Sequence, residues 1–412
     1  MAEHIYEHDK KYSLVDYKLL FNDLPVEIQL HIFSFLSYKE LCQSVACVCK
    51  QWLNLSQDPI LWQSIVYIDL KDKHFNSIRK KIAISHYLKS IKISTRSGNH
   101  GLLPILMKNC PQLIHLDLGF ETISLSSFQN INLQCKNLEY LNLEGTSIAA
   151  ESLQAIESIV QLPKLKQLNL SHCLWVDNNM IFKLSSGKSK FEYFNIDGIP
   201  NIKDNATSQF ILNNQLYLKE LIVDGESLSN ITFSNIEKCA KLIVFSSSFS
   251  ESLDHGLESI TQLTLLQTLR IRKGTRLTSE RFIRAFAIGS FLHLTDLDLS
   301  ECTGLSDAAL SVLARKMPLL KKINLSWCLD VCSSGIVKVA IHCRQLECII
   351  MKGSLAINDI SFELLVFLLP QLHFIDLQDV SSVSDDVIKM VVQKSSRYLA
   401  VINYYNIKFC SA

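Results

Sequence analysis

A hydrophobic pattern that returns about every 26 residues constrains the fold of this chain more than any other feature. The pattern is Leu-x-x-Leu-x-Leu, with Ile, Phe, Val or Met in some copies. Thirteen copies begin at residues 88, 113, 138, 165, 191, 218, 242, 266, 294, 320, 346, 372 and 399, and a weaker copy begins at 65. Such regular spacing over three quarters of the chain indicates a repeat array rather than a string of ordinary globular domains.

The periodicity changes within each repeat. The Leu-x-Leu stretch alternates apolar residues with others, as a short strand with one buried face does. In LSDAALSVLARKM, four apolar residues from Leu310 to Met317 then recur at helical spacing, and Ser306 is placed to cap that helix. One strand and one helix cannot bury both apolar faces, whereas stacked repeats share a continuous core. We therefore predict an α/β fold, a curved solenoid with a parallel sheet inside and helices outside.

Seven of the thirteen cysteines occupy two recurring positions of the repeat. They lie three residues after the last leucine of a strand, or three residues before the first leucine of the next copy. These seven are Cys110, Cys135, Cys173, Cys239, Cys302, Cys328 and Cys343. A free cysteine behaves as a small buried hydrophobic residue, so we interpret them as core residues and not as ligands or redox groups.

The repeat resembles the cysteine-containing class of leucine-rich repeats. LLKKINLSWC (319–328), LTDLDLSECTGLSDAAL (294–310) and VSSVSDDVI fit that class well. The resemblance covers about residues 65–412 and weakens at 191–197, where Phe and Ile replace leucines. It is weakest at LIVFSSSFSESL (242–253), where serines enter the strand. That copy is expected to be distorted or to carry an insertion used for binding.

Residues 21–62 have a different, helical pattern. Pro25 suits the first turn of a helix, and an apolar stripe follows, formed by Ile28, Ile32, Phe35 and Leu36. Ser37 and Glu40 make a capping box for a second helix. Cys42, Val45, Ala46 and Cys49 share one helical stripe with Trp52 a turn further on. A unit of about 40 residues holds a small core, so we expect it to need a partner surface or the adjoining repeats.

This stretch closely resembles the F-box. The matching residues are Leu24, Pro25, Glu27, Ile32, Phe33, Ser34, Phe35, Leu36, Val48, Cys49, Lys50, Trp52, Asp58, Leu61 and Trp62. The resemblance implies docking on a Skp adaptor and, through it, on a cullin–RING ubiquitin ligase. Carried over by position, the adaptor contact involves Leu24, Pro25, Ile28, Ile32, Leu36, Leu41, Val48, Cys49 and Trp52, some of which fill the domain's own core instead. The expected organisation is a polar leader (1–19), an F-box (20–62) and the repeats (63–412).

An F-box joined to leucine-rich repeats implies a substrate receptor, in which the repeats hold a protein for ubiquitination. Strand positions between the core leucines point to the concave face. The candidate substrate-binding residues there and beside it are Arg270, Arg272, Lys273, Asp298, Trp327 and Tyr405. The basic members suit an acidic or phosphorylated substrate, because guanidinium groups pair with carboxylate or phosphate. The last strand is expected to present an open edge, with Tyr404 and Tyr405 beside it.

Other classes of function find little support. No P-loop, G-x-G-x-x-G, G-x-S-x-G or H-E-x-x-H motif is present, so we expect no enzymatic activity and no cofactor. The two histidines of HIYEH (4–8) stand in a polar leader without further ligands, so no metal site is expected. A net charge of +1 argues against nucleic acid and membrane as partners of the whole chain. The lack of a signal segment and the odd number of cysteines favour an intracellular protein, in cytoplasm or nucleus.

Two further readings stay open from the sequence. The same residues would be present in a repeat scaffold that binds the adaptor but no ligase. They would equally be present in an F-box effector that a pathogen or symbiont uses with or without a host cullin ligase. Co-purification with the adaptor but never with a cullin would favour the scaffold.

Overall fold

The computed structural model describes residues 21–68, 82, 86–93, 102–124, 128, 131–148, 152–250, 253, 256–355 and 357–411. The expected leader, 1–19, and its HIYEH motif lie outside these residues. The chain divides into two compact units, Met1–Val66 and Tyr67–Ala412. Strand β1 (Ser64–Ile68) contains the point of division, and each unit is described by itself.

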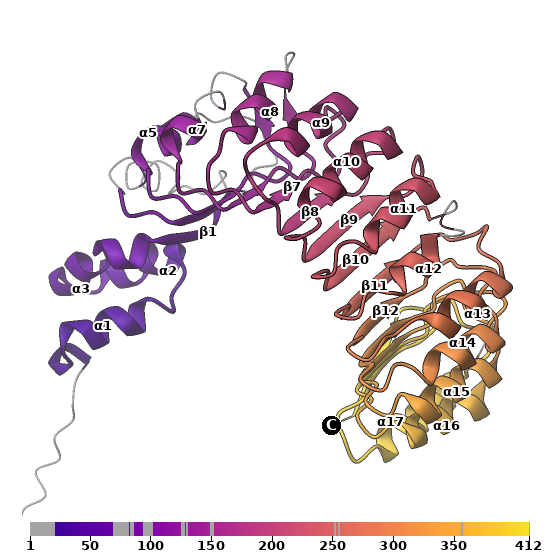
Figure 1. Cartoon of the computed structure of the whole chain (residues 1–412). Helices are drawn as coiled ribbons and strands as arrows, with labels where there is room; N and C mark the ends of the chain where they lie inside the picture. The colour runs from indigo at the N-terminus through magenta and orange to yellow at the C-terminus, as the bar shows by residue number, and fades with distance from the viewer. Residues whose placement is uncertain are drawn as a thin grey trace, which may run out of the picture. The chain divides into compact units, whose positions relative to one another are not determined.

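The N-terminal unit is built from short helices (Figure 1). Its α-helices are α1 (Val26–Phe33), α2 (Tyr38–Gln43) and α3 (Lys50–Leu55), and its 3-10 helices are η1 (Phe21–Asp23), η2 (Val45–Cys47) and η3 (Pro59–Trp62). Pro25 directly precedes α1, and its carbonyl accepts the N–H groups of Ile28 and Gln29. The capping box predicted from Ser37 and Glu40 is confirmed, since each side chain accepts the other residue's backbone N–H.

The single helical stripe expected from Cys42 to Trp52 is wrong. Helix α2 ends at Gln43, a 3-10 turn follows, and Cys49 has the extended backbone of a helix N-cap. The Cys49 thiol accepts the N–H of Trp52 at 3.5 Å, as a serine would at this position. The i, i+3, i+4 spacing therefore continues across a break in the helix, which periodicity alone does not reveal.

Aromatic rings form the core of this unit. Phe33 lies 5.4 Å from Phe21 and 5.2 Å from Trp52 between ring centroids, and Phe21 lies 4.8 Å from Trp52. Leu41 and Val45 complete the buried cluster. The Trp52 indole N–H donates to the Asn22 side chain at 2.7 Å, so the half-buried ring keeps its polar group satisfied. This small core holds α1 and α3 together.

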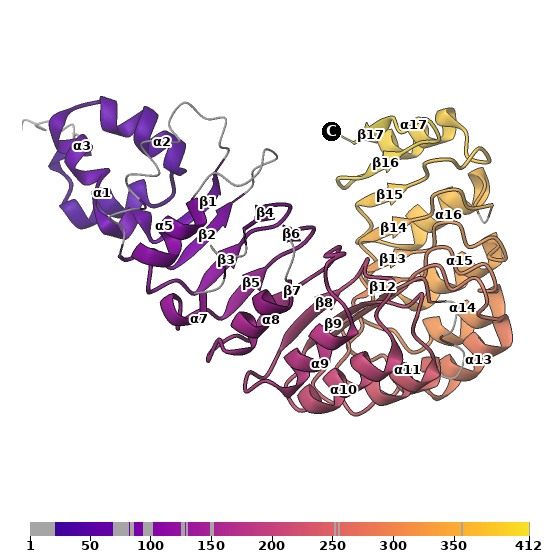
Figure 2. The ribbon, with the colours of Figure 1, turned by 90° about the horizontal axis from the view of Figure 1, so that it is seen from above.

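The repeat unit has the predicted solenoid fold, an α/β arrangement with strands on the inner, concave side and helices outside (Figures 1 and 2). Its parallel strands are β2 (Ser90–Ile93), β3 (His115–Asp117), β5 (Tyr140–Asn142), β7 (Gln167–Asn169), β8 (Tyr193–Ile196), β9 (Glu220–Asp224), β10 (Val244–Ser248), β11 (Thr268–Ile271), β12 (Asp296–Asp298), β13 (Lys322–Asn324), β14 (Cys348–Ile350), β15 (Phe374–Asp376) and β16 (Ala400–Ile402). Twelve of them begin two residues after a predicted start, which confirms the register of those repeats. Strand β16 begins one residue after the predicted start at 399, so that last start is one residue too late.

The helices follow the strands in order. They are α5 (Leu102–Asn109), α7 (Ile131–Gln134), α8 (Ser152–Val160), α9 (Asn178–Ser186), α10 (Asp204–Asn214), α11 (Asn230–Ile236), α12 (Gly256–Ile260), α13 (Ser279–Ile288), α14 (Asp307–Ala314), α15 (Ser333–His342), α16 (Asp359–Leu368) and α17 (Asp385–Lys394). Two further short strands, β4 (Thr122–Ile123) and β6 (Ser147–Ile148), pair in parallel beside the main sheet. Ser306 caps α14 as predicted, accepting the N–H of Ala309.

The leucines of each strand are buried, as the repeat pattern requires. In the copy around β12, Leu294, Leu297 and Leu299 have no exposed surface. The seven cysteines of the two recurring positions are likewise fully buried, which confirms their interpretation as core residues. Burial raises the pKa of their thiols, to about 12 for Cys328 and Cys343.

The strand most altered in sequence is regular. Strand β10 pairs in register with β9 and β11, although three of its residues are serines. Ser246 and Ser247 are buried, and Ser250 donates its hydroxyl hydrogen to the Ser247 carbonyl at 2.9 Å. The expected distortion is therefore absent from β10. Residues 251, 252, 254 and 255 lie outside the described residues. The predicted insertion at 242–253 therefore falls mostly outside the described residues as well.

The open edge expected after the last parallel strand is wrong. Strand β17 (Lys408–Cys410) folds back and pairs antiparallel with β16, placing Ala400 opposite Cys410 and Ile402 opposite Lys408. The turn contains Asn406 in the left-handed region, a conformation that asparagine tolerates. The strand is only three residues long, so the sequence NYYNIKFC shows too short a pattern to predict it.

Candidate protein-binding surfaces

The N-terminal unit exposes apolar side chains on a small domain. They are Val26, Ile28, Ile32, Phe35, Val48, Leu53 and Ile60, with Phe35 the most exposed at 76%. Ile28, Ile32 and Phe35 recur at helical spacing along α1 and its C-terminal turn, on the side not occupied by the buried residues Gln29 and Phe33. A row of exposed aliphatic and aromatic residues on such a domain is typical of a protein-binding surface.

The helix that carries this row is held by polar contacts on its inner side. The buried Gln29 side chain donates to the Leu24 carbonyl at 2.7 Å and receives a hydrogen bond from Gln51 at 3.5 Å. Gln51 belongs to the first turn of α3, which follows directly after Val48 and Cys49. The exposed residues of α1 and the exposed Val48–Cys49 turn therefore belong to elements that pack on each other.

The nine predicted adaptor residues divide into two groups. Pro25, Ile28, Ile32, Val48 and Cys49 are exposed. Leu24, Leu36 and Trp52 are half-buried, and Leu41 is buried in the core cluster, where its side chain shapes the domain and offers almost no surface to a partner. The exposed residues Val26, Leu53 and Ile60 were not predicted from the sequence. The sign that could have identified them is that they are apolar but do not belong to an apolar helical stripe.

The inner face of the repeat unit is organised in three columns of side chains that run from strand to strand. Strand pairing in register aligns equivalent residues of neighbouring repeats. From β3 to β16 the first column is His115, Tyr140, Gln167, Tyr193, Glu220, Val244, Thr268, Asp296, Lys322, Cys348, Phe374 and Ala400. The middle column is Asp117, Asn142, Asn169, Asn195, Ile222, Ser246, Arg270, Asp298, Asn324, Ile350, Asp376 and Ile402.

The third column lies two residues after the middle one, where each strand ends. Its members are Gly119, Glu144, Ser171, Asp197, Asp224, Ser248, Arg272, Ser300, Ser326, Lys352, Gln378 and Tyr404. In many repeats the middle residue is Asp or Asn, and its side-chain oxygen accepts the N–H of the third-column residue. For example, Asn142 accepts from Glu144 at 2.9 Å and Asp298 accepts from Ser300 at 3.0 Å. These turns fix where the inner face ends in each repeat.

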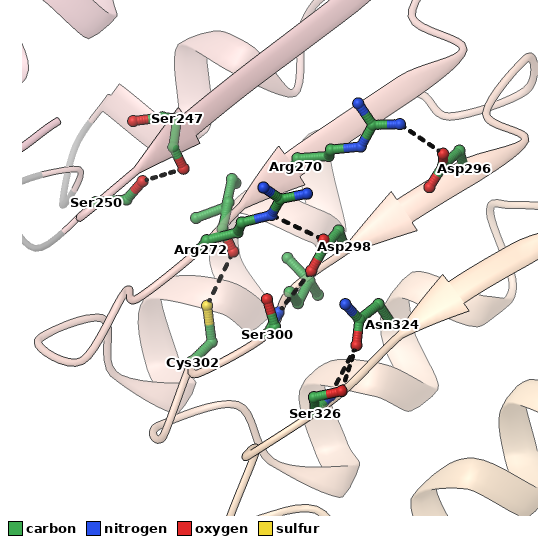
Figure 3. A network of polar contacts seen from close by, with 12 residues as sticks. Ser247, Ser250, Arg270, Arg272, Asp296, Asp298, Ser300, Cys302, Asn324 and Ser326 are labelled. Carbon is green, nitrogen blue, oxygen red and sulfur yellow. Dashed lines mark hydrogen bonds and ion pairs between the residues drawn. The ribbon is translucent and has the colours of Figure 1, made fainter. Parts of the chain in front are cut away.

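The predicted basic residues of the inner face already have carboxylate partners (Figure 3). Arg270 donates to Asp296 at 2.8 Å, and Arg272 donates through Nε to Asp298 at 2.9 Å. Both pairs join β11 to β12, which pair in register. An acidic substrate would therefore compete with an existing ion pair at each arginine, and the local charge of the four residues is balanced.

The remaining candidates have local roles as well. The Asp298 side chain is 7% exposed and is engaged by Arg272 and by the strand-end N–H of Ser300. The Lys273 ammonium lies 4.2 Å from the centre of the Phe249 ring, a cation–π contact between neighbouring repeats. Neither side chain is free to turn to a substrate without losing these contacts.

Trp327 is 46% exposed at the end of β13 and has a left-handed backbone. Its ring lies over Gly353, since a Cβ on that glycine would meet the ring at 2.3 Å. The Trp327 N–H donates to the Lys352 carbonyl at 2.9 Å. The tryptophan thus bridges two repeats and remains partly exposed to solvent, which suits a binding residue with a fixed position.

Tyr404 and Tyr405 lie in the turn between β16 and β17. Their rings meet edge to face at 5.0 Å, and Tyr405 is 73% exposed. The Tyr405 N–H donates to the Asn403 side chain at 3.1 Å. These tyrosines therefore lie at the end of β16, which β17 covers. They are distant from the Arg270–Asp298 group along the chain and along the sheet.

Within the described ranges no group of three or more histidine, cysteine, aspartate or glutamate side chains is placed to hold a metal ion. Among the same residues, no helix combines the length and the apolar character that crossing a bilayer requires.

Known proteins resemble both units. Residues 21–67 match the F-box-like family. A stretch of 151 residues, 37% of the chain, is 27% identical to a protein of Arabidopsis thaliana described as F-box/LRR-repeat protein 22, and it spans 43% of that relative's length. A chain from the crystal structure of the Rad7 and Elc1 complex of yeast has a similar fold, with a TM-score of 0.60 and 13% identity over 93% of this chain and 89% of that one. At that identity the likeness concerns the fold alone.

Proposed function

We propose that this chain, in which an F-box-like domain precedes a leucine-rich-repeat solenoid, is the substrate-recognition subunit of a Skp–cullin–F-box ubiquitin ligase. The N-terminal unit binds the Skp adaptor, and the repeats bind the protein to be ubiquitinated. The observation that carries the proposal is the exposed apolar row of Ile28, Ile32 and Phe35 on a domain that matches the F-box-like family.

The proposed mechanism is one of positioning. The chain holds a substrate near a ubiquitin-charged enzyme that another subunit supplies, which raises the effective concentration of the substrate lysine. We propose that the chain itself performs no bond chemistry and holds no cofactor. Such a role places it inside the cell, in agreement with its many unpaired thiols.

The adaptor contact can be tested by charging the exposed row. The double variant Ile28→Glu/Ile32→Glu places two carboxylates on α1, where both side chains are exposed and the core is unchanged. A matched control is Ile231→Glu/Ile360→Glu, because these isoleucines are also exposed but lie on helices of the repeat unit. Affinity purification from cells then compares the adaptor, the cullin and other proteins recovered with each variant.

We expect the first variant to lose adaptor and cullin by at least about tenfold, since buried charges at the centre of an interface typically cost 2 kcal/mol or more. Substrates should stay bound or become enriched, because they are no longer passed to the ligase. The control should recover adaptor and cullin at wild-type levels. Recovery of both proteins with Ile28→Glu/Ile32→Glu would show that this row is not the adaptor surface.

A further inference from the structure

Carboxylates on the inner face of the repeats fall into two classes. Eight stand in the three columns, and four of them have a cationic partner on a neighbouring strand. The pairs are Asp117 with Lys92 at 2.9 Å, Asp296 with Arg270 at 2.8 Å, Asp298 with Arg272 at 2.9 Å, and Asp376 with Lys352 at 3.2 Å. The other four, Glu144, Asp197, Glu220 and Asp224, have no cationic partner among the described residues.

The four unpaired carboxylates belong to one part of the sheet. They lie on or at the ends of β5, β8 and β9, which are neighbours or are separated by β7 alone (Figure 2). Asp197 and Asp224 are side by side, because the register places Ile196 opposite Val223. Glu144, Asp197 and Glu220 are half-buried and Asp224 is buried, and Glu226 adds a fifth carboxylate, which is exposed, two residues beyond Asp224. We call the surface formed by these five residues the acidic stretch.

Nearby cations are occupied elsewhere. Lys166 and Lys219 precede β7 and β9, and their ammonium groups pair with Glu139 at 2.9 Å and Glu192 at 2.6 Å. Both lysines lie one residue before their strand, outside the three columns. The negative charge of the acidic stretch is therefore not compensated from within this part of the fold.

Two observations show that this charge is held at a cost. Burial raises the pKa of the Asp224 carboxyl, and the charges of Asp197 and Glu226 add to the effect. One oxygen of Asp197, Oδ1, is buried and has no hydrogen-bond partner among the described residues. A buried carboxylate oxygen without a donor is uncommon in proteins and calls for a partner that supplies one.

Tyrosine rings flank the carboxylates. Tyr140 and Tyr193 are half-buried and begin the strands β5 and β8, which end just before Glu144 and Asp197. Burial raises the pKa of Tyr140 to about 12, with further contributions from Asp117, Tyr193 and Glu144. Burial also raises the pKa of Tyr193, so both phenols stay neutral, and neutral aromatic faces attract ammonium and guanidinium groups.

We propose that the acidic stretch binds a lysine- or arginine-rich segment of the substrate, with Tyr140 and Tyr193 contacting its side chains. The inference rests on the proposed function, because it names the substrate class that the repeats select. Carboxylates, an unsatisfied buried oxygen and tyrosine faces all favour the same ligand, a cationic peptide, and all disfavour a phosphorylated one. From β5 to β9 the sheet spans three strand spacings, about 14 Å, which about four or five extended residues cover.

The test uses the purified full-length chain and a defined probe. A fluorescein-labelled decapeptide of alternating lysine and glycine is titrated by fluorescence anisotropy, and a glutamate–glycine decapeptide serves as the opposite charge. The test variant is Glu144→Gln/Asp197→Asn/Glu220→Gln, which removes three charges without changing side-chain size. The matched control, Glu237→Gln/Glu280→Gln/Glu363→Gln, removes three charges from exposed carboxylates on the outer helices or directly after one.

We expect the lysine peptide to bind the wild type and to bind the test variant about tenfold more weakly, since three exposed ion pairs each contribute a few tenths to one kcal/mol. The control should change its affinity less than twofold, and raising the salt concentration should weaken binding to the wild type most. An equal loss in both variants would show an effect of net charge alone and would overturn the proposal. Tighter binding of the glutamate peptide would overturn it as well.

Folding and ligase assembly are read separately. Circular dichroism and the melting temperature of each variant check that the repeats remain folded. The assay contains neither adaptor nor cullin, so a failure of the proposed ligase function would leave its outcome unchanged. Conversely, loss of the acidic stretch should not reduce the adaptor recovered in the purification that tests Ile28 and Ile32.

Discussion

Single buried cysteines connect one repeat to the one before it. The Cys328 thiol donates to the Leu299 carbonyl at 3.0 Å, the Cys302 thiol to the Ile271 carbonyl at 3.3 Å, and the Cys173 thiol to the Leu143 carbonyl at 2.8 Å. In each case the acceptor lies at or near the end of the preceding strand. A cysteine therefore fills a small core space and also adds a hydrogen bond to a carbonyl of the preceding repeat; the Leu299 and Leu143 carbonyls accept a backbone N–H as well.

The exposure of the thiols predicts how many react in the folded protein. Cys47, Cys49, Cys332 and Cys410 are exposed, whereas the seven repeat cysteines are buried and burial raises their pKa. Since the thiolate is the reactive form, about four thiols should react rapidly with a disulfide reagent at pH 8. All thirteen should react in denaturant. Rapid reaction of ten or more in the native protein would contradict the burial.

Asp224 makes stability depend on pH in an unusual direction. Its folded pKa is raised above the ordinary value of 3.8, so its charged form is disfavoured in the fold. This penalty is absent below pH 3.8, appears as pH rises through the folded pKa, and persists at neutral pH. Asp224→Asn keeps an oxygen for the Glu226 N–H and should raise the melting temperature at pH 7.

The gain from Asp224→Asn should vanish when the melting temperature is measured near pH 3.5. Asp117→Asn is the matched control, because Asp117 has the Lys92 ammonium at 2.9 Å and loses that ion pair when neutralised. It should leave the melting temperature at pH 7 unchanged or lower it. A lower melting temperature for Asp224→Asn at pH 7 would show that the carboxylate stabilises the fold.

At the scale of elements, the sequence predicted what depends on periodic burial. All thirteen strands and the cap of α14 follow from leucine spacing and a serine in the right place. The break between α2 and α3 did not follow, because Cys49 caps the second helix while keeping the spacing of a continuous one. Strand β17 was missed, since pairing with β16 and not its own composition makes it a strand.

The β17 hairpin should protect the end of the sheet. Deleting residues 407–412 removes the pairing of β16 with β17 and exposes unpaired N–H and C=O groups. We expect a loss of about 2–3 kcal/mol in the free energy of unfolding, roughly one per hydrogen-bonded residue pair. Denaturant titration measures the loss, and sedimentation should show more self-association.

The control for that deletion is Tyr404→Ala/Tyr405→Ala. These side chains lie in the turn and leave the β17 backbone in place. The double variant should therefore unfold within about 0.5 kcal/mol of the wild type, as exposed positions usually do. Equal stability of the wild type and the deleted chain would show that β17 does not protect β16.

At the scale of the whole repeat unit, charge is distributed unevenly along a regular frame. The sequence located Arg270, Arg272 and Asp298 on the inner face, but it did not show that they pair. The pairing depends on the register between β11 and β12. A different register would place other residues opposite each other. Charges of opposite sign in neighbouring columns look like free groups in the sequence, whereas in the structure they form two ion pairs.

Removing the two arginines should extend the acidic stretch. Arg270→Gln/Arg272→Gln leaves Asp296 and the buried Asp298 without cations, which should lower the free energy of unfolding by roughly 1–3 kcal/mol. Binding of the lysine–glycine peptide should become about threefold tighter, since charges about 10 Å apart still interact at low salt.

The control is Arg284→Gln, which removes an arginine that pairs with Glu258 on the outer helices and is 63% exposed. It should change stability by less than about 1 kcal/mol and leave peptide binding unaltered. Weaker peptide binding by the double variant would mean that the arginines help to hold the ligand and that the acidic stretch does not act alone.

The turns that end the strands separate two demands on this molecule. Side chains such as those of Asn142 and Asn324 accept a backbone N–H two residues further on and so fix the turn that ends each strand. The leucines and cysteines fill the core. Most side chains of the first column serve neither task, and they vary from histidine and tyrosine to lysine and phenylalanine. Substitutions in the first column therefore change which proteins the repeats bind and leave the scaffold intact. Related chains of this kind are expected to differ more in their binding partners than in their fold.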